Sequence, residues 1–154
     1  MIEKLLLHFI GYGVFIGVMY GMWKSNARRW SRLARKYSAG DQIPSQESVC
    51  FAKRTMQTVI LVGGDIAWNS YKGIVTVGVT SEGILLQLLL PFSIFHAPLL
   101  IPYRDCSIEP KKWYLFGKSH QYTLTQVSNV QLIVDDELQH WIETQCASLA
   151  VAVS

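Results

Sequence analysis

The pattern of apolar and charged positions divides the chain into three parts. Residues 5–23 contain no charged side chain, and residues 24–36 then carry six positive charges and no negative one. From residue 49 onward, short apolar runs alternate with turn residues, and helical spacing returns after residue 135. This pattern predicts an apolar N-terminal helix (1–23), a basic juxtamembrane helix with a linker (24–48), and a β domain with a C-terminal helix (49–154).

The apolar segment has the length of a transmembrane helix. Its nineteen residues would span ~28 Å at a rise of ~1.5 Å per residue, close to the hydrocarbon thickness of a bilayer. A cleaved secretory signal is the alternative, but its apolar core runs only ~7–15 residues and precedes small residues. We therefore expect a single-pass anchor. The positive-inside bias then places the N-terminus outside the bacterial inner membrane and the domain in the cytoplasm.

Glycines recur along this segment at every fourth position, at Gly13, Gly17 and Gly21. Residues with that spacing stack on one helix face, where glycine lets another backbone approach closely. The functional interpretation is a helix-packing surface for a second copy or for another membrane protein. The alternative interpretation is that these glycines have no packing role and are simply tolerated, because glycine is common in membrane helices.

The basic segment combines positive charges with an apolar stripe. Trp30, Leu33, Ala34 and Tyr37 follow helical spacing and share one face. The charges could lie on anionic headgroups, or they could only set topology while the stripe packs on the domain. Both interpretations stay open. The residues assigned to the membrane surface and to topology are Lys24, Arg28, Arg29, Arg32, Arg35 and Lys36.

The remainder of the chain predicts short antiparallel strands. Residues 73–80 alternate between Val75, Val77 and Val79 on one face and polar or small residues on the other. Tight turns are expected at 81–83 and 117–120, and Asp135 is a predicted N-cap for the last helix. The other predicted strands are 49–57, 58–62, 84–90, 99–101, 106–108, 112–116, 121–125 and 129–134.

About seven antiparallel strands closed by a C-terminal helix describe a mainly-β (α+β) domain. This arrangement resembles the pleckstrin-homology (PH-like) superfold, including its GRAM-type variants. The resemblance implies two near-orthogonal sheets that a C-terminal helix plugs at one end. It carries only a weak functional expectation, because one fold hosts many functions.

A second resemblance rests on short motifs. Trp30-x-x-Leu33-Ala34-x-x-Tyr37, the glycine-containing stretch 73–84, and the stretch 96–103 (HAPLLIPY) occur in that order. The chain is similar to a family of small uncharacterised bacterial proteins with W-x-x-L-A-x-x-Y and H-x-P-L-L-I-P signatures. The resemblance covers about residues 30–110 and implies a shared fold, but it brings no catalytic residue.

Composition and motifs give no case for an enzyme. Residues 37–154 hold seven Lys or Arg against ten Asp or Glu, and this negative balance argues against a nucleic-acid binder. The three cysteines are widely spaced, and the four histidines form no metal-ligand pattern. We therefore expect no catalytic residues, no metal site and no cofactor.

The apolar run 84–95 loses the alternation of a half-buried strand. A strand buried between the sheet and the upstream helix is one interpretation. The other is a loop that contacts a partner or the membrane, since exposed apolar patches mark contacts. His96 either belongs to this contact or caps backbone groups. The candidate contact residues are Leu90, Phe92, Ile94, Phe95 and His96.

Together these features predict a membrane-anchored, non-enzymatic binding or scaffolding protein. In this hypothesis it is an accessory subunit of a larger inner-membrane complex. It docks through the glycine-faced helix and the cytoplasmic PH-like domain, with anionic headgroups as a further contact. The alternative is a membrane-tethered domain that senses lipid or a small ligand, bound in the barrel mouth or at His96. An enzyme whose site no motif reveals is a third hypothesis.

Overall fold

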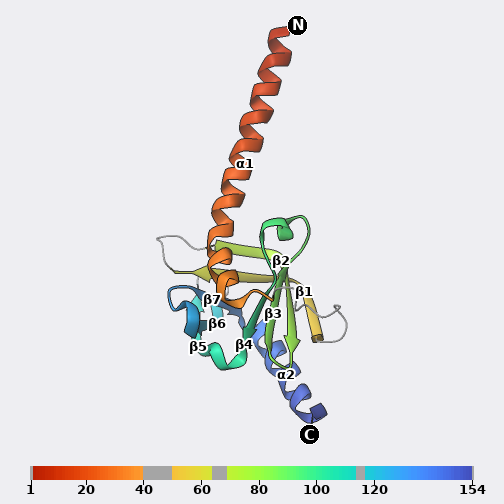
Figure 1. The fold of residues 1–154 in the computed structure, drawn as a ribbon, viewed down its shortest axis with the longest axis vertical. Coiled ribbons are helices and arrows are strands. Elements are labelled where there is room, and N and C mark those ends of the chain that lie inside the picture. Colours follow the sequence, from red (N-terminus) through yellow and green to blue (C-terminus); the bar gives the residue numbers. More distant parts are fainter. Residues whose placement is uncertain (1, 40–49, 64–68, 114–116, 154) are drawn as a thin grey trace.

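The computed structural model describes residues 2–39, 50–63, 69–113 and 117–153 (Figure 1). Within these residues, two α-helices flank a β domain that also contains three short 3-10 helices. The elements in chain order are α1 (Ile2–Tyr37), β1 (Cys50–Val62), β2 (Asn69–Thr80), β3 (Gly83–Leu88), η2 (Phe92–Phe95), β4 (Leu99–Pro102), η3 (Tyr103–Asp105), β5 (Cys106–Trp113), β6 (Gly117–Leu124), η4 (Thr125–Val127), β7 (Gln131–Asp135) and α2 (Asp136–Val153).

The structure corrects the membrane interpretation. Within the residues that it describes, no helix is both long enough and apolar enough to cross a membrane. The predictions of a transmembrane anchor over residues 1–23 and of a single-pass membrane protein are therefore wrong. A crossing needs ~20 consecutive apolar residues.

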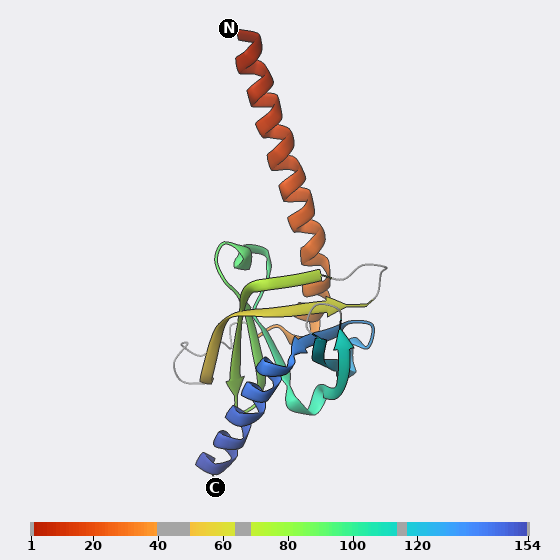
Figure 2. The same cartoon turned by 180° about the vertical axis from the view of Figure 1, so that it is seen from behind.

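All seven strands belong to one antiparallel sheet, in the order β4-β3-β2-β1-β7-β6-β5. The sheet curls around its own inner face, as the two opposite views show (Figures 1 and 2). The PH-like resemblance implied two near-orthogonal sheets, whereas here β1 pairs with both β2 and β7 and makes the sheet continuous. The structure therefore has one curved sheet instead of the two packed sheets that the resemblance implied.

The curl depends on irregularities in β1. The sequence analysis divided this region into strands 49–57 and 58–62, but the structure has one strand, Cys50–Val62. Its pairing with β2 shifts register at three places, and Met56 lies in the left-handed region with φ 57°. Such bulges bend a strand and increase its twist. The break expected at residue 57 is therefore a bend within a continuous strand.

The predicted tight turn at 81–83 is confirmed. β2 ends at Thr80 and β3 begins at Gly83. The backbone N–H groups of Glu82 and Gly83 donate to Thr80 Oγ1 at 3.2 and 3.0 Å, and that hydroxyl donates to the Gly83 carbonyl at 2.8 Å. Gly83 is required here, because a Cβ at this position would collide with the Ile101 carbonyl of β4.

Two predictions about the β5–β6 hairpin are wrong. The strand predicted at 106–108 is longer in the structure, where β5 runs through Pro110 to Trp113. Because β5 is an edge strand, a proline there need not cost the sheet a hydrogen bond. The turn expected at 117–120 is also misplaced, since β6 begins at Gly117. Residues 114–116 lie outside the described part of the chain.

The hydrophobic core fills the inner side of the curled sheet. It joins Val75, Val77 and Val79 of β2, on the face that the alternation predicted, to side chains of both helices. The two helices leave the domain in opposite directions (Figures 1 and 2). The helical side chains in the core are Trp30, Leu33 and Tyr37 of α1 and Leu138 and Ile142 of α2.

The start of α2 agrees with its predicted cap. The backbone N–H of Leu138 donates to Asp135 Oδ1 at 2.7 Å, which satisfies one of the unpaired amides of the first helical turn. Asp136 and Glu137 follow in that turn, where the helix dipole favours negative charge.

Substitution of Gly83 by alanine tests the close approach of β3 to β4. We expect Gly83→Ala to lower the free energy of unfolding by about 2–3 kcal/mol, because the added methyl group must displace backbone rather than a flexible side chain. Gly17→Ala is the matched control, since nothing lies within 4 Å of a Cβ there. Urea unfolding of both variants measures the difference. Equal stabilities would contradict the steric argument.

Candidate functional site

The second half of α1 is attached to the domain. The side chains of Trp30, Leu33 and Tyr37 are buried on the sheet, and Ala34 packs beside them. This is the stripe that helical spacing predicted. One of the two alternatives for the basic segment, packing of its apolar stripe on the domain, is therefore confirmed.

Two contacts hold the end of α1 against residues 97–99. The Trp30 indole N–H donates to the Ala97 carbonyl at 2.7 Å, and the Ala39 N–H donates to the Pro98 carbonyl at 3.0 Å. The second bond belongs to an isolated antiparallel bridge that pairs Ser38 with Leu99. We refer to these contacts between 30–39 and 97–99 as the latch. The latch fixes the direction in which α1 leaves the domain.

Tyr37 extends this attachment to the other side of the sheet. Its hydroxyl accepts a hydrogen bond from the backbone N–H of Gln126 at 3.2 Å. Gln126 belongs to η4, which connects β6 to β7. Burial raises the pKa of Tyr37, so the phenol stays neutral in this contact. The end of α1 therefore joins the β4 side of the sheet to the β6–β7 connection.

Arg29 lies away from the surface where the sequence analysis placed it. Only 7% of the residue is exposed. Its Nε donates to the Gly63 carbonyl at 3.2 Å, and one terminal nitrogen donates to Asn69 Oδ1 at 2.5 Å. These bonds satisfy a buried guanidinium that burial alone would destabilise. Arg29 thus helps to attach α1 to the sheet.

Next to this contact, three aromatic rings meet edge to face. The Trp30 ring centroid lies 5.3 Å from that of Tyr71 and 5.6 Å from that of His96, and the Tyr71 and His96 centroids are 5.9 Å apart. Edge-to-face pairs at these distances are favourable. Burial raises the pKa of Tyr71 to about 12, although a hydrogen bond with Asn69 and the charge of Arg29 act in the opposite direction.

The other predicted basic residues are more accessible. Arg28, Arg35 and Lys36 are exposed, and Arg32 is half-buried and takes part in an interaction of its own. The side chain of Lys24 lies outside the described residues. The exposed cations thus surround the base of α1, where it meets the domain.

The first half of α1 projects from the domain (Figures 1 and 2). We call residues 10–21 the projecting segment; its described side chains are those of residues 10–17, 20 and 21, and all are exposed. A Cβ at Gly13, Gly17 or Gly21 would have nothing within 4 Å. The large apolar side chains here are half to two-thirds exposed, and they belong to Ile10, Tyr12, Val14, Phe15, Ile16 and Tyr20.

A second apolar surface lies on the loop between β3 and β4. Leu90 is 81% exposed and Ile94 is 62% exposed, with Phe92 between them at 40%. The side chain of Phe95 lies outside the described residues. In both views this loop lies on the side of the domain from which α1 projects (Figures 1 and 2). The predicted contact loop and the glycine-bearing helix therefore share one end of the molecule, which we call the apolar end.

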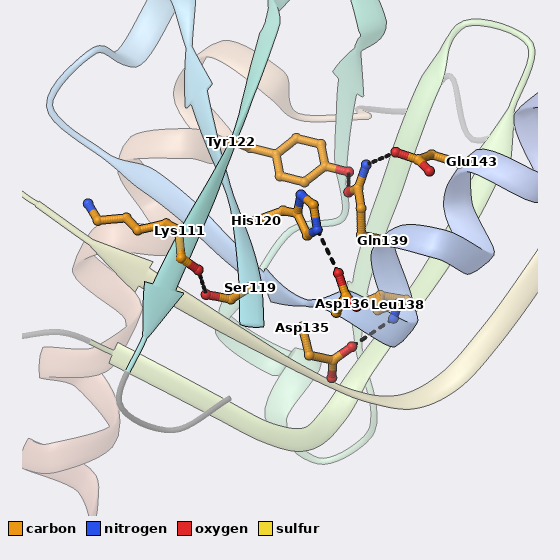
Figure 3. A network of polar contacts seen from close by, with 9 residues as sticks. All are labelled: Lys111, Ser119, His120, Tyr122, Asp135, Asp136, Leu138, Gln139 and Glu143. Atoms are coloured by element: carbon orange, nitrogen blue, oxygen red, sulfur yellow. Dashed lines mark hydrogen bonds and ion pairs between the residues drawn. The ribbon is translucent and has the colours of Figure 1, made fainter. Parts of the chain in front are cut away.

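At the other side of the domain, a polar network connects β6 to α2 (Figure 3). His120 Nε2 lies 2.9 Å from Asp136 Oδ1, and the Tyr122 hydroxyl donates to Gln139, whose Nε2 donates to Glu143 at 2.8 Å. Because each of these contacts pairs the sheet with α2 or runs along α2, the network holds the C-terminal helix in place.

The same network does not assemble a nucleophile with a base. The Ser119 hydroxyl donates to the Lys111 carbonyl at 2.5 Å (Figure 3). Ser119 and His120 are neighbours in a strand, so their side chains point to opposite faces. Among the described residues, no group of three or more His, Cys, Asp or Glu side chains could hold a metal ion.

Comparisons with protein-family models, curated proteins and solved structures found no match. The resemblances noted in the sequence therefore stay predictions. The candidate site rests on the geometry of the apolar end alone.

Sequence reasoning missed Asn69 and Tyr71, which lie in β2 and contact α1 through Arg29 and Trp30. No local pattern identifies such long-range partners. A signal did exist for Arg29, because it lies four residues before Leu33 and so shares the face of the apolar stripe.

Because Arg29 is buried and Arg28 is exposed, their substitution should affect the free energy of unfolding differently. We expect Arg29→Ala to lower the free energy of unfolding by about 1–3 kcal/mol, because it leaves the Gly63 carbonyl and Asn69 without their buried donor. Arg28→Ala, one position away and exposed, should change it by less than about 0.5 kcal/mol. Chemical unfolding of both variants tests this difference. A larger loss in Arg28→Ala would show that surface charge, rather than the buried bonds, holds α1.

Proposed function

We propose that this protein is a non-enzymatic binding or scaffolding protein, an accessory component of a larger protein assembly. It docks through the apolar end. One observation carries the proposal: the projecting segment exposes half to two-thirds of each large apolar side chain that is described there. Contiguous apolar surface of this kind marks an interaction site, because leaving it in water costs ~25 cal/mol per Å².

The geometry of α1 favours a helix as the occupant. Gly13, Gly17 and Gly21 lie on one face with open space above them. A partner helix can therefore approach the backbone closely along this face and bury the larger side chains beside it.

The positive charges near the base of the projecting segment further restrict the kind of partner that can bind. Arg28, Arg35 and Lys36 are exposed, and complementary charge orients two surfaces and suppresses wrong partners. The proposed partner is therefore a protein with an apolar helix that has acidic residues at one end. The exposed loop residues Leu90 and Ile94 supply a second contact on the same side.

The latch supports this role because it makes the docking element rigid. A helix held by Trp30 and Ala39 presents its surface in one direction. Less conformational entropy is then lost on binding than with a freely jointed helix.

A pair of valine variants tests the proposal. Val14 on α1 is 62% exposed, and Val151 on α2 is 77% exposed. We expect Val14→Glu to weaken partner binding at least about tenfold, because a carboxylate would be buried without a counter-charge. Val151→Glu should leave binding unchanged. The measurement is stoichiometric copurification with the intact chain, combined with photo-crosslinking from position 16 to a helix of the captured protein.

Other occupants give different results in the same experiment. Crosslinks only between copies of this chain, with a dimer mass by light scattering, would replace the partner with a second copy. Binding to vesicles of anionic lipid but to no protein would replace it with headgroups. Either result, or equal capture by both valine variants, contradicts the proposal of a helical protein partner.

A further inference from the structure

His96 lies at the junction between α1 and the loop that carries the second apolar surface. Only 3% of the residue is exposed, and neither ring nitrogen has a hydrogen-bond partner among the described residues. Its ring packs edge to face on Trp30 and Tyr71. The residue that follows it, Ala97, accepts the Trp30 hydrogen bond of the latch. A buried imidazole without partners therefore lies directly beside the contacts that hold α1.

Among the groups that shift the pKa of His96, no acidic side chain favours a positive charge on its ring, and the Phe92 backbone is the one group that does. From α1, the buried charged group is Arg29, whose guanidinium is bonded to Gly63 and Asn69. From β2, the titratable neighbour is the phenol of Tyr71, which stays neutral at ordinary pH. From the loop, residues 90–94 carry no charged side chain. A protonated imidazole would thus be buried against two aromatic rings without an acidic partner.

We propose that His96 makes the latch sensitive to acid, so that protonation of its ring releases the end of α1 from the segment 97–99. The neutral ring is compatible with the packed junction. The protonated ring must reach water or a counter-charge, and either movement separates Trp30 from Ala97. This inference concerns the attachment of α1 and does not depend on which partner the apolar end binds.

The direction of the pH dependence follows from linkage. Burial lowers the pKa of His96 in the latched state, and the Phe92 backbone acts in the opposite direction. In the open state the ring regains an ordinary pKa of about 6.5. The open state therefore binds more protons below that pH, and the latch loses stability as pH falls. If the latched ring stays neutral throughout this range, uptake of one proton in the open state increases the opening equilibrium about tenfold between pH 7.5 and 5.5.

Opening of the latch would also change the apolar end. The latch holds the projecting segment at a fixed angle to the loop that carries Leu90 and Ile94. Its release would separate these two apolar surfaces without unfolding the sheet, because the register of β1–β7 does not include the latch contacts. Acid would thus change the relative position of the two apolar surfaces, while the residues that form them stay the same.

Hydrogen exchange at the Ala39 amide measures the opening, because this N–H donates to Pro98 across the latch. In the full chain we expect its protection factor, corrected for the intrinsic rate at each pH, to fall about tenfold between pH 7.5 and 5.5. The protection factor of the Leu138 amide, bonded to Asp135 in α2, should stay constant. His96→Phe should abolish the pH effect at Ala39, because phenylalanine keeps the edge contacts and has no titratable group.

His140→Gln is the matched control, since His140 is exposed on α2 and its replacement should leave the tenfold change intact. Unchanged Ala39 protection in the parent chain, or the same fall in His96→Phe, would overturn the proposal. Imidazole nitrogen shifts of His96 in the parent chain provide a test that needs no variant. A ring that remains neutral at pH 5.5 in the latched state supports the proposal, and one that titrates near 6.5 contradicts it.

Discussion

The burial of Trp30 is the interaction on which the arrangement of this molecule depends. Its indole is fully buried, packs against Tyr71 of β2 and His96, and donates to the Ala97 carbonyl. One side chain therefore joins the long helix, the centre of the sheet and the loop before β4. Burial of an aromatic ring of this size contributes several kcal/mol. It is also the reason that a helix of 36 residues has a defined direction relative to the domain.

Where a local pattern determines structure, the sequence was informative. The stripe from Trp30 to Tyr37, the alternation of valines in β2, the turn after Thr80 and the cap at Asp135 all follow from spacings within a few residues. Each of these features was predicted and is present. The exposure of Leu90 and Ile94 also agrees with one of the two interpretations of the apolar run, the one in which it continues into a contact loop.

The errors came from features that tertiary context decides. A proline ends a central strand but is tolerated at an edge, and only the order of strands reveals that β5 is an edge. A cationic residue normally faces solvent, but Arg29 finds Gly63 and Asn69, which are more than thirty positions away. The transmembrane prediction depended on a run of nineteen residues without a charged side chain. In the part of the chain that the structure describes, no helix is long and apolar enough to cross a membrane.

The two edges of the curled sheet have a consequence for how the protein can associate. At β4, Ser38 already pairs with Leu99, and at β5, Pro110 interrupts the row of amides next to Lys111 and Lys112. In the described strands, neither edge therefore offers an uninterrupted template for strand addition, which is the usual route to fibrous aggregates. These two edges therefore disfavour edge-to-edge pairing between the sheets of two copies.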